Sequence, residues 1–192
     1  MVSPAAPSVQ PVRFVREAHA LDGALRDAKQ QQCPRCRRFS ALIGHGFLVG
    51  YAEHTNDLVV RGRRLLCSNR GRRGGCGRTV SLRIASELAG FSARTWALSR
   101  LMLAAISGVS LRATWTQHVA SPLSLRSGYR LHKRLLKAQA HLRTTLSTAS
   151  PPPDCDGVHP LSQVLSHLHQ VLGSHECVLS RFQLRFQRHL LS

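Results

Sequence analysis

The sequence predicts a mainly α-helical protein with one small β-rich region, and three observations support this prediction. Two pairs of cysteines lie a hairpin's length of chain apart, with short runs of β-forming residues between them. From about residue 93 onward, apolar residues recur at the helical spacing of three and four. A proline triplet at residues 151–153 then precedes a last pair of amphipathic segments. The predicted order is a zinc ribbon, a helix-turn-helix and a C-terminal helical pair.

Four segments follow from these changes of pattern. Residues 1–32 start with a proline-rich lead-in to Pro11, which is expected to be disordered, and continue from Arg13 to Gln32 as a short amphipathic helix or a frayed arm. Residues 33–83 are expected to form the ribbon and residues 84–148 the helix-turn-helix. Residues 149–192 hold the proline linker and the helical pair.

The cysteine spacing predicts a structural zinc site. Cys33 and Cys36 enclose Pro34 and Arg35, while Cys67 and Cys76 enclose an eight-residue insert rich in arginine and glycine. Four thiolates in two such pairs can surround one tetrahedral Zn²⁺ ion. Either His45 or His54, which lie between the pairs, is an alternative to one of the thiolates. Disulfides are disfavoured, because residues 1–12 lack the apolar run of a secretion signal.

The charge of the chain indicates a polyanionic partner. The 192 residues include 27 Lys and Arg against 9 Asp and Glu, a formal net charge of +18. Residues 151–192 are balanced, so all of the excess positive charge precedes them. The chain has no amphipathic membrane anchor, and nucleic acid is therefore the expected polyanion rather than a membrane surface.

One cluster of arginines surrounds the second cysteine pair. Held near a metal, these side chains would repel one another without a counter-charge, which favours contact with a phosphate backbone or a narrow minor groove. The alternative is a solvated charge run in a flexible loop. The candidates are Arg61, Arg63, Arg64, Arg70, Arg72, Arg73 and Arg78.

The helical block begins with a segment from Ala93 to Ser107, which Gly108 should end. Ser110 is expected to cap a second helix, Leu111 to His118, with Trp115 as its core anchor. Ser121 and Pro122 then start a third helix that runs to about Leu146. Two short helices and a longer one are the outline of a helix-turn-helix.

The third helix has two distinct faces. Its apolar side is formed by Leu131, Leu135, Ala138, Leu142 and Leu146. A surface helix usually mixes charges of both signs, yet the chain has no acidic residue between Glu87 and Asp154. The opposite face is therefore expected to contact nucleic acid through Arg126, Arg130, Lys133, Arg134 and Lys137.

The combination of Cys-Pro-x-Cys, a Gly-His-Gly turn, a second cysteine pair running into Cys76-Gly77-Arg78, and the later Ser107-Gly108-Val109-Ser110 resembles a known arrangement. It is similar to the zinc-ribbon and helix-turn-helix front part of bacterial insertion-sequence transposases over about residues 33–146. The resemblance implies binding to the terminal DNA of a mobile element. The eight residues between Cys67 and Cys76 depart from that pattern, in which the second pair of cysteines is close together. The carboxylates of the transposase catalytic domain are also missing, since only Asp154, Asp156 and Glu176 follow the helices.

The tail is expected to fold back on the basic part or to bind a partner. Its helices place Leu161 to Leu172, and Leu179 to Leu190, at helical spacing. His167-Leu168-His169 matches a nuclease motif only superficially, because side chains two apart diverge on a helix. A second metal site made of Cys155, His159, His175 and Cys177 has irregular spacing and is disfavoured.

These observations predict a DNA-binding protein with structural Zn²⁺ and no catalysis of its own, acting as an accessory or regulatory factor of a bacterial mobile element in the cytoplasm, at the nucleoid. Duplex DNA is the expected partner, and a recombinase or transposase is a candidate partner for the C-terminal helices. Two alternatives remain open: an RNA-binding basic zinc protein, and an adaptor that works through the C-terminal helices.

Overall fold

A computed structural model describes residues 12–52, 55, 57–71, 74–119, 123–154, 159–174 and 177–191. The expected lead-in before residue 12, together with His54, Arg72, Arg73, Ser121, Pro122, Cys155 and His175, lies outside the described residues. The described chain contains six helices and one four-stranded sheet. It divides into two units, residues 1–48 with 60–84, and residues 49–59 with 85–192.

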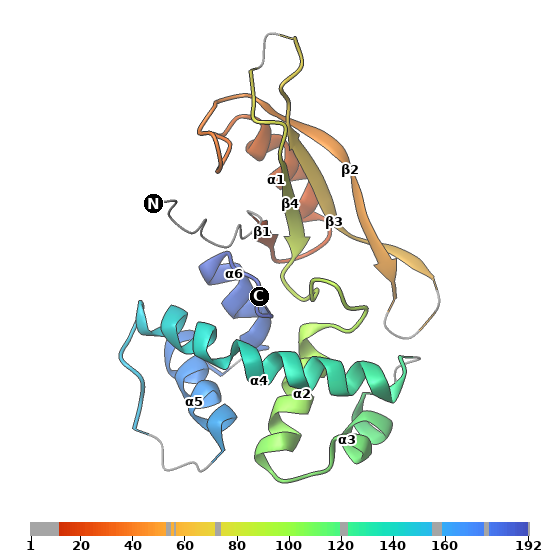
Figure 1. Cartoon of the computed structure of the whole chain (residues 1–192), viewed down its shortest axis with the longest axis vertical. Helices are drawn as coiled ribbons and strands as arrows, with labels where there is room; N and C mark the ends of the chain where they lie inside the picture. Colours follow the sequence, from red (N-terminus) through yellow and green to blue (C-terminus); the bar gives the residue numbers. More distant parts are fainter. Residues whose placement is uncertain are drawn as a thin grey trace, which may run out of the picture. The chain divides into compact units, whose positions relative to one another are not determined.

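The first unit is built on a mixed sheet with the strand order β1-β4-β3-β2 (Figure 1). Strand β1 (Val12–Val15) pairs in parallel with β4 (Thr79–Ile84), and β3 (Leu58–Cys67) pairs antiparallel with β4. Strand β2 (Leu42–Tyr51) is the neighbour of β3. Only residues 52–57 connect them, too few for a parallel crossover, so these two strands form an antiparallel hairpin.

The segment expected to be one helix from Arg13 to Gln32 is a strand followed by a helix. Val12 and Phe14 are buried on one side of β1, and the chain then enters α1 (Ala20–Lys29). The prediction was wrong for residues 13–15, because the β-branched and aromatic run of β1 alternates with period two over only four residues.

The core of this unit lies between α1 and the sheet. Helix α1 contributes Leu21 and Ala28, and two of the cysteines belong to the same cluster. The segment predicted to be a separate arm thus shares a core with the segment predicted to be the ribbon. The buried cluster is Leu21, Ala28, Cys33, Ala41, Leu42, Leu65, Cys67, Val80, Leu82 and Ile84.

The second unit starts with three helices close to those expected from the sequence. They are α2 (Thr95–Ile106), α3 (Leu111–His118) and α4 (Leu125–Ser147). Gly108 has a φ of 71°, in the left-handed region that glycine often adopts where a helix ends. The Ser110 hydroxyl caps the start of α3, since it accepts a hydrogen bond from the amide of Ala113 at 3.2 Å. Helix α4 begins later than predicted, after Ser124 rather than at Ser121.

The two C-terminal helices fold back onto this unit, as one of the two alternatives predicted. They are α5 (Pro160–Leu172) and α6 (Val178–Phe186). Their apolar stripes belong to the same buried cluster as α2 and α4, so residues 149–192 are not a separate unit. Leu161, Leu168 and Phe182 are completely buried in it. None of the described helices has both the length and the hydrophobicity needed to cross a membrane.

Candidate metal centre and cationic surfaces

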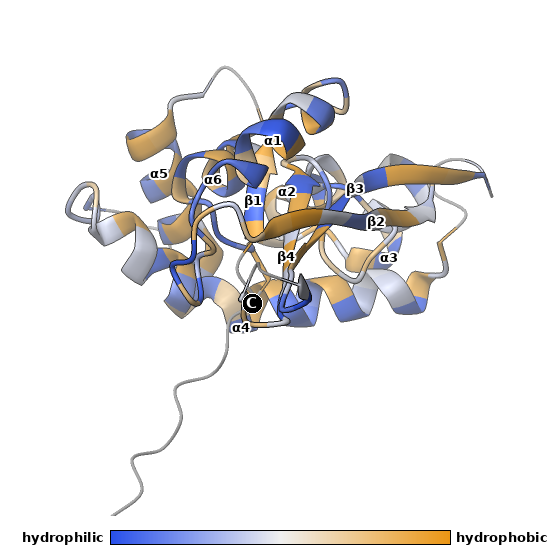
Figure 2. Ribbon diagram, turned by 90° about the horizontal axis from the view of Figure 1, so that it is seen from above, coloured by the Kyte–Doolittle hydropathy of each residue, from blue (hydrophilic) through white to orange (hydrophobic). Residues whose placement is uncertain are grey.

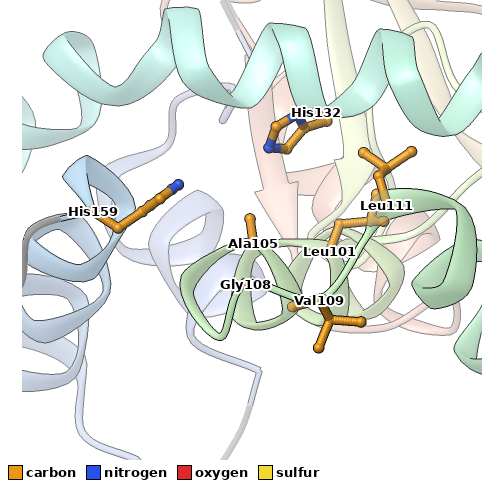
Figure 3. Close-up of a pocket in the computed structure, with 8 residues that line it drawn as sticks. Leu101, Ala105, Gly108, Val109, Leu111, His132 and His159 are labelled. Atoms are coloured by element: carbon orange, nitrogen blue, oxygen red, sulfur yellow. The ribbon is translucent and has the colours of Figure 1, made fainter.

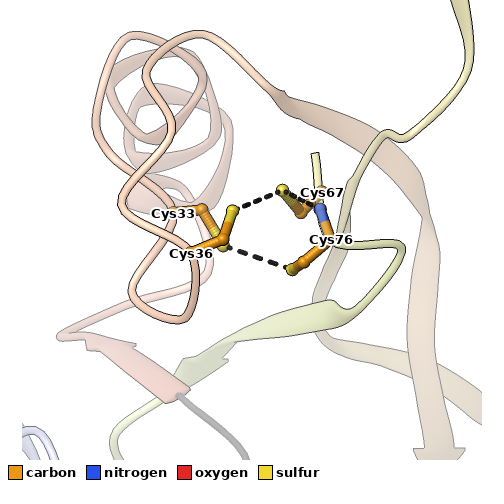
Figure 4. A group of neighbouring side chains, drawn as sticks. All are labelled: Cys33, Cys36, Cys67 and Cys76. Carbon is orange, nitrogen blue, oxygen red and sulfur yellow. Dashed lines mark hydrogen bonds between the residues drawn. The ribbon is translucent and has the colours of Figure 1, made fainter. Parts of the chain in front are cut away.

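The four cysteines predicted to bind a metal lie together in the first unit (Figure 4). Their sulfur atoms are all within 4.8 Å of one another. The sulfur atoms of Cys33 and Cys76 are 3.9 Å apart, and those of Cys36 and Cys67 are 3.6 Å apart. A tetrahedral ion with metal–sulfur bonds of about 2.3 Å requires sulfur separations of about 3.8 Å. The thiols therefore fit a tetrahedral metal, and their separations are too long for disulfides of about 2.05 Å.

The first knuckle follows α1 directly. The amide of Arg37 donates to the carbonyl of Cys33 at 2.8 Å, and the amide of Cys33 donates to the carbonyl of Arg38 at 2.9 Å. These two bonds close a tight loop that turns Cys36 back towards Cys33. The backbone N–H of Arg38 lowers the pKa of the Cys36 thiol to about 7, which favours the thiolate that a metal needs.

The second knuckle shows how an eight-residue insert still brings its cysteines together. The amide of Gly75 donates to Ser68 at 2.7 Å, and that of Gly77 donates to Cys67 at 2.8 Å, so the insert is closed at its base. A Cβ on Gly75 would lie 2.6 Å from the Cys67 sulfur and 2.4 Å from the Ser68 carbonyl oxygen. Only glycine fits at this position.

The buried position of Cys67 means that its thiol needs a nearby positive charge to lose its proton. Burial raises the pKa of this thiol to about 12, although the amide of Cys76 donates to its sulfur at 3.3 Å. Without a cation, the buried sulfur is therefore expected to stay protonated near neutral pH. A divalent metal ion would supply the missing positive charge.

The histidine alternative is not supported where the structure can test it. His45 is exposed on β2 and is absent from the four-residue group, which contains only cysteines among the described residues. His54 lies outside the described residues. Of the disfavoured second metal site, His159 caps α5 by accepting from the amide of Leu161, and Cys177 lies 3.6 Å from the Thr95 hydroxyl.

The predicted arginine cluster separates into engaged and exposed members. Arg61 is buried, and Arg63 pairs with Asp22, with its Nε 3.2 Å from the carboxylate, while its guanidinium lies 3.9 Å from the Phe47 ring centroid. This pairing holds the pKa of Asp22 below its usual value. The described arginines of the cluster with exposed side chains are Arg64, Arg70 and Arg78.

The two faces of α4 lie as the sequence predicted. All five cationic residues of the helix named above are exposed, and all five apolar ones are buried. Figure 2 shows the resulting alternation of hydrophilic and hydrophobic segments along α4. Arg134 also lies over the Phe91 ring, with its guanidinium 5.2 Å from the ring centroid.

Sequence reasoning overlooked a further exposed group on α3. Arg112, Thr116 and Gln117 project from this helix, which follows the turn at Gly108. The sequence contained a signal for this group, because a helix-turn-helix, where one is expected, carries its base-contacting residues on the helix after the turn.

The second unit also contains a shallow cavity of about 270 Å³ (Figure 3). It is lined by α2, the turn that follows it, His132 of α4 and His159 at the start of α5. The histidines of the rejected nuclease motif are elsewhere on α5 and diverge: His167 is buried and lies 2.9 Å from the Ser150 carbonyl oxygen, and His169 is exposed.

Comparisons with protein-family models, with curated proteins and with solved structures find no match to this chain.

Proposed function

We propose that this protein binds nucleic acid, with duplex DNA as its main partner, and that its four cysteines hold one structural Zn²⁺ ion. The observation that carries the proposal is the exposed cationic face of α4, which has no acidic residue beside it along the chain from residue 88 to residue 153. Such a face attracts phosphates and releases their counterions.

The zinc part of the proposal rests on the sulfur geometry. Four thiols at separations close to those of a tetrahedral site, in two knuckles closed by backbone hydrogen bonds, match the donor set that structural zinc prefers. The ion would supply folding energy rather than chemistry. The proposal assigns no catalysis to the chain.

The helices α2 and α3, joined by the turn at residues 107–110, support a helix-turn-helix as the DNA-binding element. In this arrangement α3 offers Arg112 and Gln117 to base edges, and the cationic face of α4 offers charge to phosphates. The mobile-element setting comes from the resemblance described above. RNA remains the second candidate, because the same cations attract either polymer.

The adaptor alternative is less favoured. The apolar stripes of α5 and α6 are buried against α2 and α4, and those described stripes leave no apolar face for a recombinase or transposase to cover. A partner at the tail would have to bind polar surface instead.

The test compares the DNA affinity of a variant that lacks two cationic side chains of α4 with that of a variant that lacks two cationic side chains elsewhere. Replacing Arg130 and Arg134 with Ala should weaken binding to a labelled DNA duplex, while the control Arg26→Ala/Arg188→Ala removes the same charge from other exposed positions. If both arginines contact phosphates, the slope of log K against log salt should fall by about one per residue. Circular dichroism should show both variants folded, because exposed charges contribute little to stability.

Wild-type affinity and wild-type salt dependence in the Arg130/Arg134 variant would exclude α4 as a contact surface. A parallel titration with structured RNA at the same salt concentration separates the two polymers. Tighter binding of RNA than of DNA would overturn the choice of partner.

A further inference from the structure

A surface hollow of about 640 Å³ lies beside the first cysteine knuckle, within the first unit. It is bounded by the end of α1 and by the loop that carries Cys33 and Cys36. The volume is within the range of small-ligand sites. Its lining residues are Arg13, Gln30, Gln31, Gln32, Cys33, Pro34, Arg37 and Phe39.

Phe39 is unusual among these residues. Phe39 is 65% exposed, although its backbone forms an antiparallel bridge with Gln32. An aromatic ring with so little cover beside a hollow is a platform on which a planar group can stack.

The backbone around Phe39 is strained. Arg37 and Ser40, which flank it, have φ values of 58° and 51°, in the left-handed region that side chains other than glycine rarely adopt. The hydrogen bond from the Arg37 amide to Cys33 holds the first of them in place. Strain of this kind persists only where the surrounding structure enforces it, and strained residues cluster at functional sites. Here it lies in the loop that carries Arg37 and Phe39 to the edge of the hollow.

The charge and polarity of the lining match the other parts of a nucleotide. Arg13 and Arg37 are cationic, and none of the described lining residues is acidic. Three consecutive glutamines supply amide donors and acceptors of the kind that hydrogen-bond to base edges. Arg13 donates to the side-chain oxygen of Gln31, so the cationic and amide parts of the lining lie next to each other.

We propose that this hollow binds one unpaired nucleotide of a nucleic-acid strand, with the base stacked on Phe39, its edge hydrogen-bonded by Gln30 to Gln32, and its phosphate near Arg13 and Arg37. This inference rests on the proposed nucleic-acid binding and adds a preference to it. A base within a duplex is stacked and paired, so the site selects strand ends, extensions or extruded bases.

The experiment measures the affinity of the full-length, zinc-loaded protein for three labelled probes by fluorescence anisotropy: a flush duplex, the same duplex with a short single-stranded extension, and the extension strand alone. The extension should raise the affinity about 5- to 150-fold, the effect of stacking one base on an aromatic side chain. Phe39→Ala should remove this gain and leave the affinity for the flush duplex unchanged. Phe39→Tyr should keep it, because a tyrosine ring stacks as well.

The matched control is Phe47→Ala, which removes an exposed phenylalanine of the same unit from β2, outside the hollow. This variant should keep the gain from the extension. Thermal unfolding should show Phe39→Ala as stable as the wild type, since the side chain buries little surface.

The possible outcomes distinguish the nucleotide site at Phe39 from nucleic-acid binding in general. Equal affinity for flush and extended duplexes, or a full gain retained by Phe39→Ala, would overturn the nucleotide site while nucleic-acid binding stands. Binding to none of the probes would overturn both.

Discussion

Gly128 lies inside α4, where glycine is normally unfavourable. Its position is explained by the ring of Trp115 on α3, because a Cβ built on Gly128 would lie 2.8 Å from a ring carbon. The ring itself is fixed, since it is buried and its Nε1 donates to the carbonyl of Leu123 at 3.0 Å. The missing side chain thus allows α3 and α4 to approach each other closely.

Replacing Gly128 with Ala should lower the free energy of unfolding by roughly 1–3 kcal/mol, because the added methyl group forces Trp115 or the helix to move. The control is Gly23→Ala in α1, where an added Cβ meets nothing within 4 Å. That variant should gain up to about 1 kcal/mol from helix propensity. Denaturant unfolding measures both, and a Gly128→Ala protein as stable as the wild type would contradict the packing argument.

His132 faces the cavity of the second unit, and its Nε2 is buried without a hydrogen-bond partner among the described residues. Burial lowers the pKa of this histidine below its usual 6.5, and the neighbouring His159 lowers it further (Figure 3). The folded protein therefore resists protonation at this position more than the unfolded chain does.

This difference predicts a loss of stability in acid. As the pH falls through 6.5, the unfolded chain takes up a proton that folded His132 does not, so the free energy of unfolding should fall until the lowered folded-state pKa is reached. In His132→Gln the decrease between pH 7 and pH 5 should be smaller than in the wild type. Denaturant titrations with zinc held in excess measure the difference, and equal decreases in the two proteins would contradict it.

Among the elements, α6 is held by its apolar stripe and also by one buried amide side chain. The Nε2 of Gln183 donates to the carbonyl oxygens of Ala85 and Glu87 at 2.8 and 3.1 Å, and its Oε1 accepts from the amide of Leu190 at 3.3 Å. One side chain thereby joins the segment that leads towards α2, helix α6 and the turn that follows it. Because Gln183 is buried, water cannot easily replace these hydrogen bonds.

Gln183→Leu should therefore destabilise the second unit by about 1–3 kcal/mol, since it removes three hydrogen bonds to backbone groups at a buried site while keeping a similar volume. Gln170→Leu is the control, because Gln170 is exposed and its hydrogen bond to Ser150 is at the surface. Its effect should stay within about 0.5 kcal/mol. Thermal unfolding of the two variants decides, and equal melting temperatures would count against the role of Gln183.

The elements that the sequence predicted well are those with local signals. The helices after residue 93 have enough turns for their apolar spacing to be read, and Ser110 and Gly108 mark ends that depend only on neighbouring residues. Strand β1 was missed because its partner β4 lies far along the chain and pairs in parallel, which no local pattern indicates. The spacing of the four cysteines was sufficient to predict that their thiols lie close together.

Details of the candidate sites needed the tertiary structure. The sequence shows Arg63 and Asp22 as distant residues, so their pairing could not be foreseen, and it does not reveal that Arg61 is buried. The hollow beside Cys33 depends on the left-handed backbone at Arg37 and Ser40, neither of which is a glycine that would announce such a turn.

For the whole molecule, the described residues form two separate hydrophobic cores, one for each unit. The helical core draws on five helices, whereas the core of the sheet is small and includes two of the cysteines. Small cores often need a metal or disulfides to be stable. The first unit is thus expected to depend on the metal, and the second unit is not.

The purified protein should contain about one zinc ion per chain, and removal by a chelator should unfold the first unit only. Far-UV circular dichroism should then keep most of its helical signal, and thermal unfolding should lose one of two transitions. Cys36→Ser should behave like the chelated protein. Cys177→Ser, which lies outside the four-cysteine group, should keep its zinc and both transitions.

Metal-free protein that melts in the same two transitions as the zinc-loaded protein would refute this dependence. Loss of the helical signal together with the metal would show instead that the two units unfold as one.

The parallel pairing of β1 with β4 means that the first strand to be synthesised waits for the last strand of its sheet. Closing the chain from Val15 to Thr79 orders a long loop, but a metal that joins Cys33 to Cys76 shortens that loop roughly threefold and reduces its closure entropy by about 1 kcal/mol. The metal should therefore bind before β1 docks. Until it does, β4 presents an unpaired edge to other chains, and aggregation during synthesis should depend on the zinc supply.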